Sequence, residues 1–164
     1  MAQGAIDAAR AAGAEQYATA EYTAATTALE NAHDAVAAGD YRLALNNALT
    51  SHERAQNAAR ETANSKATKR AAAERTITEL DTFLDQADAR LATAQRARVP
   101  QRLLAGPVKE IATIRADVQE AREVVEAGDY LAAEKALEGM RPRIDAVLTE
   151  IGNAATPQPA RRRR

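Results

Sequence analysis

The tetrapeptide Ala-Gly-Asp-Tyr occurs twice in this chain, at residues 38–41 and again, 89 positions later, at residues 127–130. Glycine directly after a helix readily adopts the left-handed conformation that ends the helix, and aspartate is a preferred N-cap for a following helix. The tyrosine is then expected to pack at the corner between two antiparallel helices. The predicted turn residues are Gly39, Asp40, Tyr41, Gly128, Asp129 and Tyr130.

The segments before the two turns share one apolar spacing, which alternates between three and four residues. The apolar positions are Tyr22, Ala25, Leu29, Ala32 and Val36 before the first turn, and Ile111, Ile114, Val118, Ala121 and Val125 before the second. This spacing places one apolar stripe on each helix. We therefore expect an internal duplication of a helix–turn–helix unit. The stripes are expected to form an internal core, with oligomerisation as the alternative for the helix that follows the first turn.

A long segment without glycine or proline, residues 41–98, follows the first turn. It carries an apolar stripe at Ile77, Leu80, Leu84, Ala87, Leu91 and Ala94. Weak helix formers around 62–68 leave open whether this is one helix or a bent pair. Val99-Pro100 is expected to end the helix, and Gly106-Pro107 to begin the next.

The predicted fold is all-α: an elongated antiparallel helical bundle of two helix–turn–helix units joined by a long helix. Three divisions are expected: an N-terminal hairpin unit at 1–75, a three-helix unit at 76–153 and a disordered basic tail at 154–164. The first unit is expected to begin with a short helix at about 4–16. The second is expected to contain helices at 76–98, 107–127 and 130–152.

Composition argues against an enzyme. More than half of the hydrophobic residues are alanine and aromatics make up only 3%, so the core is thin and offers little material for a pocket. The absence of cysteine excludes thiol nucleophiles and zinc–thiolate sites. The two histidines, His33 and His52, are expected about a turn and a half apart along the first hairpin, exposed or at an interface. We predict no catalytic, cofactor-binding or metal-binding residues, and no cofactor.

The acidic residues that follow helical spacing are likewise not expected to form a site. Asp81, Asp85 and Asp88, and likewise Glu123 and Glu126, follow helical spacing with no predicted cleft beside them. Catalytic carboxylates need a cleft that perturbs their pKa. We expect these carboxylates to lie on solvated helix faces.

Charge is unevenly distributed along the chain. Residues 1–40 carry six acids and one arginine, whereas residues 41–75 carry seven bases and three acids. Neighbouring helices of opposite charge are therefore expected to pair. Four arginines end the chain, Arg161, Arg162, Arg163 and Arg164, and such a cluster can bind the phosphates of nucleic acid or anionic lipid.

The two turns resemble the intra-repeat turn of tetratricopeptide repeats. Ala44 and Ala133 follow the tyrosines by three residues, and the small residues Ala32 and Ala121 lie where that repeat brings its helices close together. The chain departs from the repeat because it has only two units and because 89 is not a multiple of the 34-residue period.

The first unit also resembles a bacterial domain-of-unknown-function family of small alanine-rich envelope proteins, many of them lipoproteins. The resemblance covers about a third of the chain, from Ala8-Ala9-Arg10 to Arg60, through Gly13-Ala14, Tyr22, Leu29-Glu30-Asn31-Ala32 and Gly39-Asp40-Tyr41. It implies a non-catalytic interaction or structural module of the cell envelope. The lipobox cysteine and the leader of that family are not found in this sequence.

The expected partners follow from these features. The first hypothesis is a protein or a cell-envelope component, and the alternative is a polyanion, nucleic acid or anionic lipid, bound through the arginine tail. No apolar run approaches the roughly 18 residues of a membrane span, and a homo-oligomer is compatible with the stripes. The location is expected to be periplasmic or envelope-associated if a leader precedes Ala2, and cytoplasmic otherwise.

Overall fold

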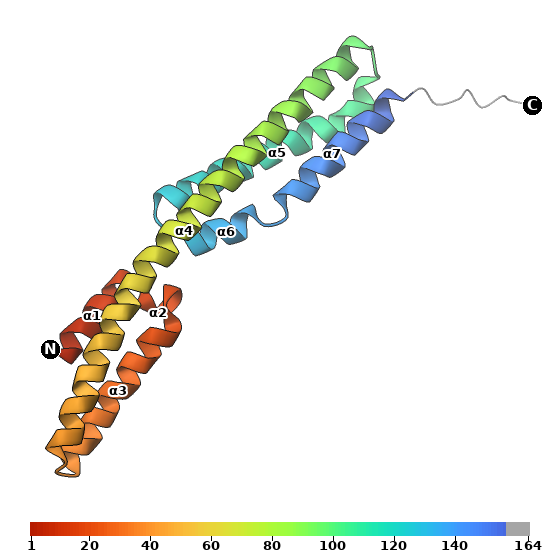
Figure 1. Ribbon diagram of the computed structural model, residues 1–164. Helices are drawn as coiled ribbons and strands as arrows, with labels where there is room; N and C mark the ends of the chain where they lie inside the picture. The colour runs from red at the N-terminus through yellow and green to blue at the C-terminus, as the bar shows by residue number, and fades with distance from the viewer. Residues whose placement is uncertain (157–164) are drawn as a thin grey trace, which may run out of the picture. The chain divides into compact units, whose positions relative to one another are not determined.

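The computed structural model describes residues 1–156, and within that range every regular element is a helix (Figure 1). The helices are α1 (Ala2–Ala12), α2 (Ala14–Tyr17), α3 (Thr19–Ala37), α4 (Tyr41–Arg96), α5 (Gln101–Glu126), α6 (Tyr130–Leu137) and α7 (Met140–Ala155). The predicted all-α helical bundle is confirmed.

Helix α4 runs unbroken through the segment for which the sequence left a bend open. The absence of glycine and proline permits this continuity. Thr62, one of the weak helix formers, is buried and donates its hydroxyl to the carbonyl of Ala58 at 2.7 Å. That bond satisfies the hydroxyl without interrupting the helix.

The chain divides into two compact units, of which unit 1 covers residues 1–68 and unit 2 begins at Lys69. The side chains of α4 change partner at this point. Lys66 Nζ donates to the carbonyl of Ala12 in unit 1 at 2.7 Å, whereas Lys69 Nζ donates to Glu134 in unit 2 at 2.6 Å. The boundary therefore lies inside α4, seven residues before the predicted division at 75/76.

Unit 1 consists of α1, α2, α3 and the first half of α4, around a core made almost entirely of alanine. That core is Ile6, Ala9, Ala14, Ala18, Tyr22, Ala25, Ala55 and Ala58. The hydroxyl of the buried Ser51 on α4 donates to the carbonyl of Ala25 on α3 at 2.8 Å. Such a side chain–backbone bond requires the close helix approach that alanines allow.

Unit 2 packs the second half of α4 against α5, α6 and α7 around larger side chains. Its most deeply buried aliphatic residues include Leu84, Ile114 and Ile144. Helices α4 and α5 are antiparallel, because Asp88 pairs with Arg115 and Asp81 pairs with Arg122. The apolar stripe predicted before the second turn is buried along its whole length.

Helix α5 begins earlier than predicted, at Gln101, and contains Pro107 within it. The clash of a proline ring with the preceding residue is smallest when that residue has no Cβ, and Gly106 has none. Pro100 precedes the first turn of the helix with an extended ψ of 129°, so the helix begins directly after it.

The helix predicted at 130–152 is two helices, because Glu138 is extended and Gly139 is left-handed with φ 76°. A similar break divides the predicted helix at about 4–16, where Gly13 has φ 98°. Helix α7 then continues to Ala155, so the first residues of the predicted tail are helical. The rest of that tail, from Pro157, lies outside the described residues.

Candidate functional site

The two Gly-Asp turns have the same backbone geometry in both units. Gly39 and Gly128 are left-handed, with φ 78° and 83°. The carboxylate of Asp40 accepts the Leu43 N–H at 2.9 Å, and that of Asp129 accepts the Ala132 N–H at 3.0 Å. Each glycine ends one helix, and each aspartate caps the next.

The two tyrosines after these turns differ. Tyr130 is half-buried and packs against the core of unit 2, whereas Tyr41 is 72% exposed. The expectation that both pack at a hairpin corner is therefore wrong for Tyr41. Val36, which the apolar stripe placed in the core, is also 51% exposed.

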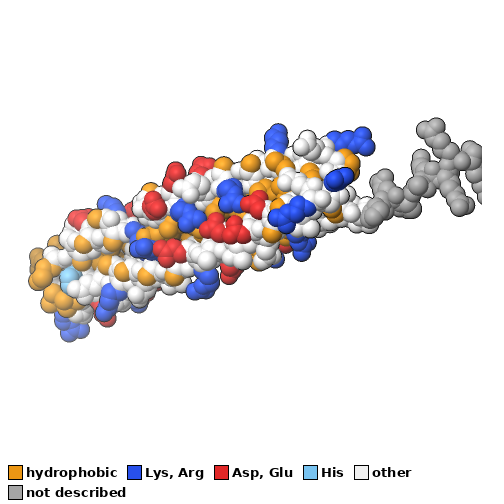
Figure 2. Space-filling view, turned by 90° about the horizontal axis from the view of Figure 1, so that it is seen from above, with side chains coloured by type: hydrophobic (Ala, Val, Ile, Leu, Met, Phe, Trp, Pro, Cys, Tyr) orange, Lys and Arg blue, Asp and Glu red, His pale blue; other side chains and the backbone are white. Residues whose placement is uncertain are grey.

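Tyr41 and Val36 belong to a larger exposed apolar surface at the α3–α4 turn. Leu45 and Leu49 follow Tyr41 at intervals of four residues on α4, and each is 59% exposed. We call Val36, Tyr41, Leu45 and Leu49 the tip face. Figure 2 shows hydrophobic side chains gathered at the end of unit 1 that holds this turn. Large apolar side chains clustered in this way commonly mark an interaction site.

The internal duplication shows what covers the corresponding surface in unit 2. The counterparts of the tip face, 89 positions later, are Val125, Tyr130, Glu134 and Glu138. Val125 and Tyr130 belong to the core built on α4, and Glu134 pairs with Lys69 of α4. Glu138 lines a groove of about 450 Å³ together with Lys69. In unit 2 the third helix, α4, therefore packs over Val125 and Tyr130, while Glu134 and Glu138 remain exposed at its edge.

Unit 1 has a shorter third helix, α1, which leaves the tip face uncovered. The apolar cluster around α1 extends along α3 only to Leu29 and begins on α4 at Ala55. Between Leu29 and the turn, the residues buried in the hairpin are the alanines Ala32, Ala35 and Ala44, which lie between the two helices. The third-helix position of unit 1 is thus occupied at one end and open beside the turn.

The histidines do not form a site. His33 is exposed, and His52 is half-buried with Nε2 3.1 Å from the side-chain nitrogen of Gln56. His52 Nδ1 is buried without a hydrogen-bond partner. Within residues 1–156 no group of three or more acidic or histidine side chains is arranged to hold a metal ion.

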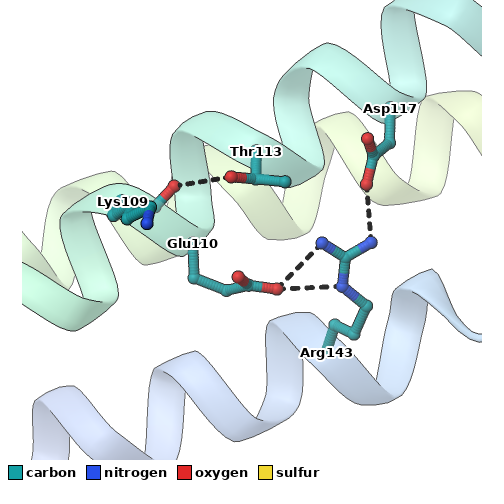
Figure 3. Close-up of polar contacts among 5 residues, drawn as sticks. All are labelled: Lys109, Glu110, Thr113, Asp117 and Arg143. Atoms are coloured by element: carbon teal, nitrogen blue, oxygen red, sulfur yellow. Dashed lines mark hydrogen bonds and ion pairs between the residues drawn. The ribbon is translucent and has the colours of Figure 1, made fainter.

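The charged side chains of unit 2 form ties between helices. Arg143 on α7 donates to Glu110 at 2.9 Å and to Asp117 at 2.6 Å, both on α5 (Figure 3). Hydrogen bonds to Asp117 and then to Glu110 raise the pKa of Arg143 above its ordinary value. Asp81 and Asp88, expected on a solvated face, pair with arginines of α5 at about half exposure.

Two grooves of unit 2 have few unpaired polar groups in their lining. One of about 340 Å³ lies between α4 and α7 and is lined largely by alanine, with Arg90 and Thr93 as its polar members. In the groove beside α6, Lys69 and Glu134 are already paired with each other. Active sites usually gather several convergent polar groups in an apolar pocket, and neither groove does so.

Sequence reasoning did not single out Leu45 and Leu49. The signal was present in the duplication, because these leucines occupy the positions of Glu134 and Glu138 in the second unit. Arg161 to Arg164, the other predicted site, lie outside the described residues. None of the helices described is long and apolar enough to cross a membrane.

Comparison with known proteins adds no relative, since no family model, curated protein or solved structure matches the chain.

Proposed function

We propose that this chain is a non-catalytic helical interaction module that binds an α-helix on the tip face of unit 1. The observation that carries the proposal is the difference between the two duplicated hairpins. In unit 2 a third helix packs over Val125 and Tyr130 beside the turn, whereas their counterparts in unit 1, Val36 and Tyr41, are exposed. An amphipathic helix commonly buries its apolar stripe against an exposed apolar helix surface of this kind.

The residues that replace one another between the units support the same function. Glu134 in unit 2 is paired with a lysine of the covering helix, whereas its counterpart in unit 1 is Leu45. Glu138 is likewise replaced by Leu49. Exposed leucines at two positions where the duplicate has carboxylates favour an apolar partner there over solvent.

Position-specific photo-crosslinking tests the proposal in cells that produce the protein naturally. A photoreactive phenylalanine analogue is placed at Leu49 in one variant and at Leu43 in a matched control. Leu43 is also exposed, at 48%, but its counterpart Ala132 does not line the groove that Lys69 of α4 forms with Glu134 and Glu138 in unit 2. We expect protein adducts from position 49 and none from position 43. Equal yields from both positions, or no adduct at either, would contradict the proposal.

A location in the bacterial envelope forms a second part of this proposal. It is supported by the resemblance of residues 8–60 to alanine-rich envelope proteins. Fractionation of native cells, with N-terminal sequencing of the recovered protein, tests it. Recovery in the cytosolic fraction alone would remove the envelope location and leave the helix-binding role standing.

A further inference from the structure

We propose that the end of unit 2 at which α4 passes into α5 is a docking surface for an anionic lipid bilayer. Four exposed residues define this surface, and we call them the basic end: Arg96, Arg98, Arg102 and Leu103. The basic end is a different surface from the tip face and takes a different partner, so neither role depends on the other.

The stretch that joins α4 to α5 is strongly basic. Residues 89–109 contain five basic residues and no aspartate or glutamate. The end of α4, the start of α5 and the end of α7 meet at the same end of unit 2 (Figure 1), where Figure 2 shows Lys and Arg side chains gathered. Residues 151–156 of α7 add no acid, and Glu150 is the acid that shares a groove with Arg102. This end of unit 2 therefore presents a positive surface.

The arginines of the basic end differ from those in the middle of unit 2. Arg115 and Arg122 on α5 each pair with an aspartate of α4. Arg96, Arg98 and Arg102 are exposed and take part in no ion pair among residues 1–156. Their charges do not tie helices together, and they are available to a partner.

Local structure does not explain arginine at two of these positions. Arg98 has φ 60°, and it is the one residue other than glycine with a positive φ among residues 1–156. A side chain is strained in this conformation, and glycine is the residue that helix ends favour there. Arg102 lies in the first turn of α5, where the helix dipole favours an acid over a cation. Only Arg96, in the last turn of α4, has a charge that the dipole favours. Strained or unfavourable residues that the fold does not require point to a function.

The composition of this end favours a bilayer over nucleic acid. Leu103 is 45% exposed beside Arg102. An exposed apolar side chain among arginines suits an anionic membrane surface, because the apolar group enters the interface while the guanidinium groups remain at the phosphates. Proteins that bind single-stranded nucleic acid stack its bases on aromatic side chains, and residues 89–109 contain none. The arginines also come from two helix ends and the turn between them, whereas readers of duplex DNA present one helix to the major groove.

Vesicle flotation of the full chain tests the docking surface. The chain is mixed with phosphatidylcholine vesicles that contain either about 30% phosphatidylserine or none, in about 0.1 M NaCl. We expect binding to the anionic vesicles and none to the neutral ones. Arg96→Gln/Arg98→Gln/Arg102→Gln should weaken this binding about a hundredfold, because each arginine near an anionic surface contributes about a factor of five. Absence of binding by the wild-type chain would overturn the proposal.

A matched variant removes the same charge from elsewhere on α4. Arg42, Arg60 and Arg75 are exposed and take part in no ion pair among residues 1–156. Their joint replacement by glutamine should change the affinity for anionic vesicles by no more than about twofold, because charges beyond a Debye length from the membrane are screened. Circular dichroism and Tm confirm that both variants remain folded. Equal losses in the two variants would show that net charge alone attracts the chain, and would overturn the basic end as the site.

A single substitution tests the apolar part of the surface. Leu103→Gln should weaken the binding to anionic vesicles about fivefold, since its exposed half no longer enters the interface. Val108→Gln is the matched control, because Val108 is also on α5 and is 44% exposed but lies outside the basic end. It should leave the affinity unchanged. The same affinity for wild type and Leu103→Gln would overturn the choice of a bilayer over a soluble polyanion.

Two further measurements decide the partner and the site. A DNA duplex and a single-stranded RNA of mixed sequence replace the vesicles, and binding to either without binding to vesicles would overturn the lipid partner. A chain that ends at Thr156 retains the basic end and lacks Arg161 to Arg164. We expect it to keep its preference for anionic vesicles. Complete loss of binding in that chain would assign the binding to the arginine tail and overturn the basic end.

Discussion

At the scale of single residues, Gly39 and Gly128 are the turn positions at which a substitution is expected to lower the stability of the hairpins. Both are left-handed, a conformation that costs an L side chain about 1 kcal/mol or more. We expect Gly39→Ala to destabilise unit 1, and Gly128→Ala unit 2, each by about 1 kcal/mol. No heavy atom lies within 4 Å of a Cβ added at either position, so the cost is conformational. Urea denaturation followed by circular dichroism measures it.

Two other glycines provide matched controls. Gly4 in α1 and Gly152 in α7 have no positive φ, and a Cβ added to either meets nothing within 4 Å. Alanine at these positions should stabilise the corresponding unit by about 0.5–1 kcal/mol, through helix propensity. Equal losses at all four glycines would show that the turns have no special requirement for glycine.

Much of the residue-level structure follows from local sequence, and the exceptions have a physical cause. The conformations of Gly39 and Asp40 depend on the helix ends beside them, and were predictable. The exposure of Tyr41 depends on whether a third helix reaches the turn, and that is decided by tertiary structure and not by the neighbouring sequence. The duplicate Tyr130 has the same neighbours in sequence and is nonetheless half-buried.

At the scale of elements, Lys66 secures the end of α1. Its Nζ donates a hydrogen bond to the carbonyl of Ala12 at 2.7 Å and lies 5.1 Å from the centre of the Tyr17 ring. Free carbonyls at a helix C-terminus are stabilised by such a cation. We expect Lys66→Ala to cost about 1 kcal/mol locally, and so to speed amide hydrogen exchange in α1 about fivefold. Lys69→Ala, whose partner is in unit 2, should leave α1 exchange unchanged.

The core of unit 2 should be sensitive to truncation. Leu84 on α4 is fully buried in the unit 2 cluster. Leu84→Ala removes this side chain and leaves a cavity, and we expect it to destabilise unit 2 by about 2–5 kcal/mol. Leu43→Ala removes the same atoms from an exposed position and should cost no more than about 0.5 kcal/mol. Thermal unfolding of both variants measures the difference, and similar Tm values for the two would contradict the described core.

Helix identities were predictable from apolar periodicity, but two boundaries were not. Gly106-Pro107 is a common start signal, yet an earlier turn of helix forms because Gly106 leaves room for the proline ring. Gly139 interrupts an apolar stripe that continues on both sides, from Leu137 to Met140. Because the three- or four-residue spacing of buried positions continues across Gly139, periodicity does not indicate that the helix breaks there.

At the scale of the whole chain, the two units should differ in stability. Unit 1 has Ile6 as its only fully buried large aliphatic side chain among the residues described, whereas unit 2 has Leu84, Ile114 and Ile144. Burial of larger side chains removes more apolar area from water. We expect the amides of α3 to exchange through openings at least about 2 kcal/mol less costly than those of α5. Hydrogen exchange with mass spectrometry resolves the two, and uniform protection would show that they unfold as one.

The candidate site became recognisable only at this scale. An exposed leucine is unremarkable by itself, and composition or spacing alone does not distinguish Leu45 from Leu43. The distinction requires knowing that Lys69 of α4 pairs with Glu134 in unit 2, while the apolar cluster around α1 ends short of Leu45 in unit 1. The predicted apolar stripes described the core well, but they contain no information about the length of a neighbouring helix.

Helix α4 is the second helix of one hairpin and the covering helix of the next. Because α4 belongs to both hairpins, the chain resembles a repeat array, in which one helix of each repeat packs on the next repeat. Repeats of this kind are extended at their ends, where an outer unit lacks a neighbour on one side. The exposed tip face is the surface that one more designed helix, packed antiparallel to α3, would bury.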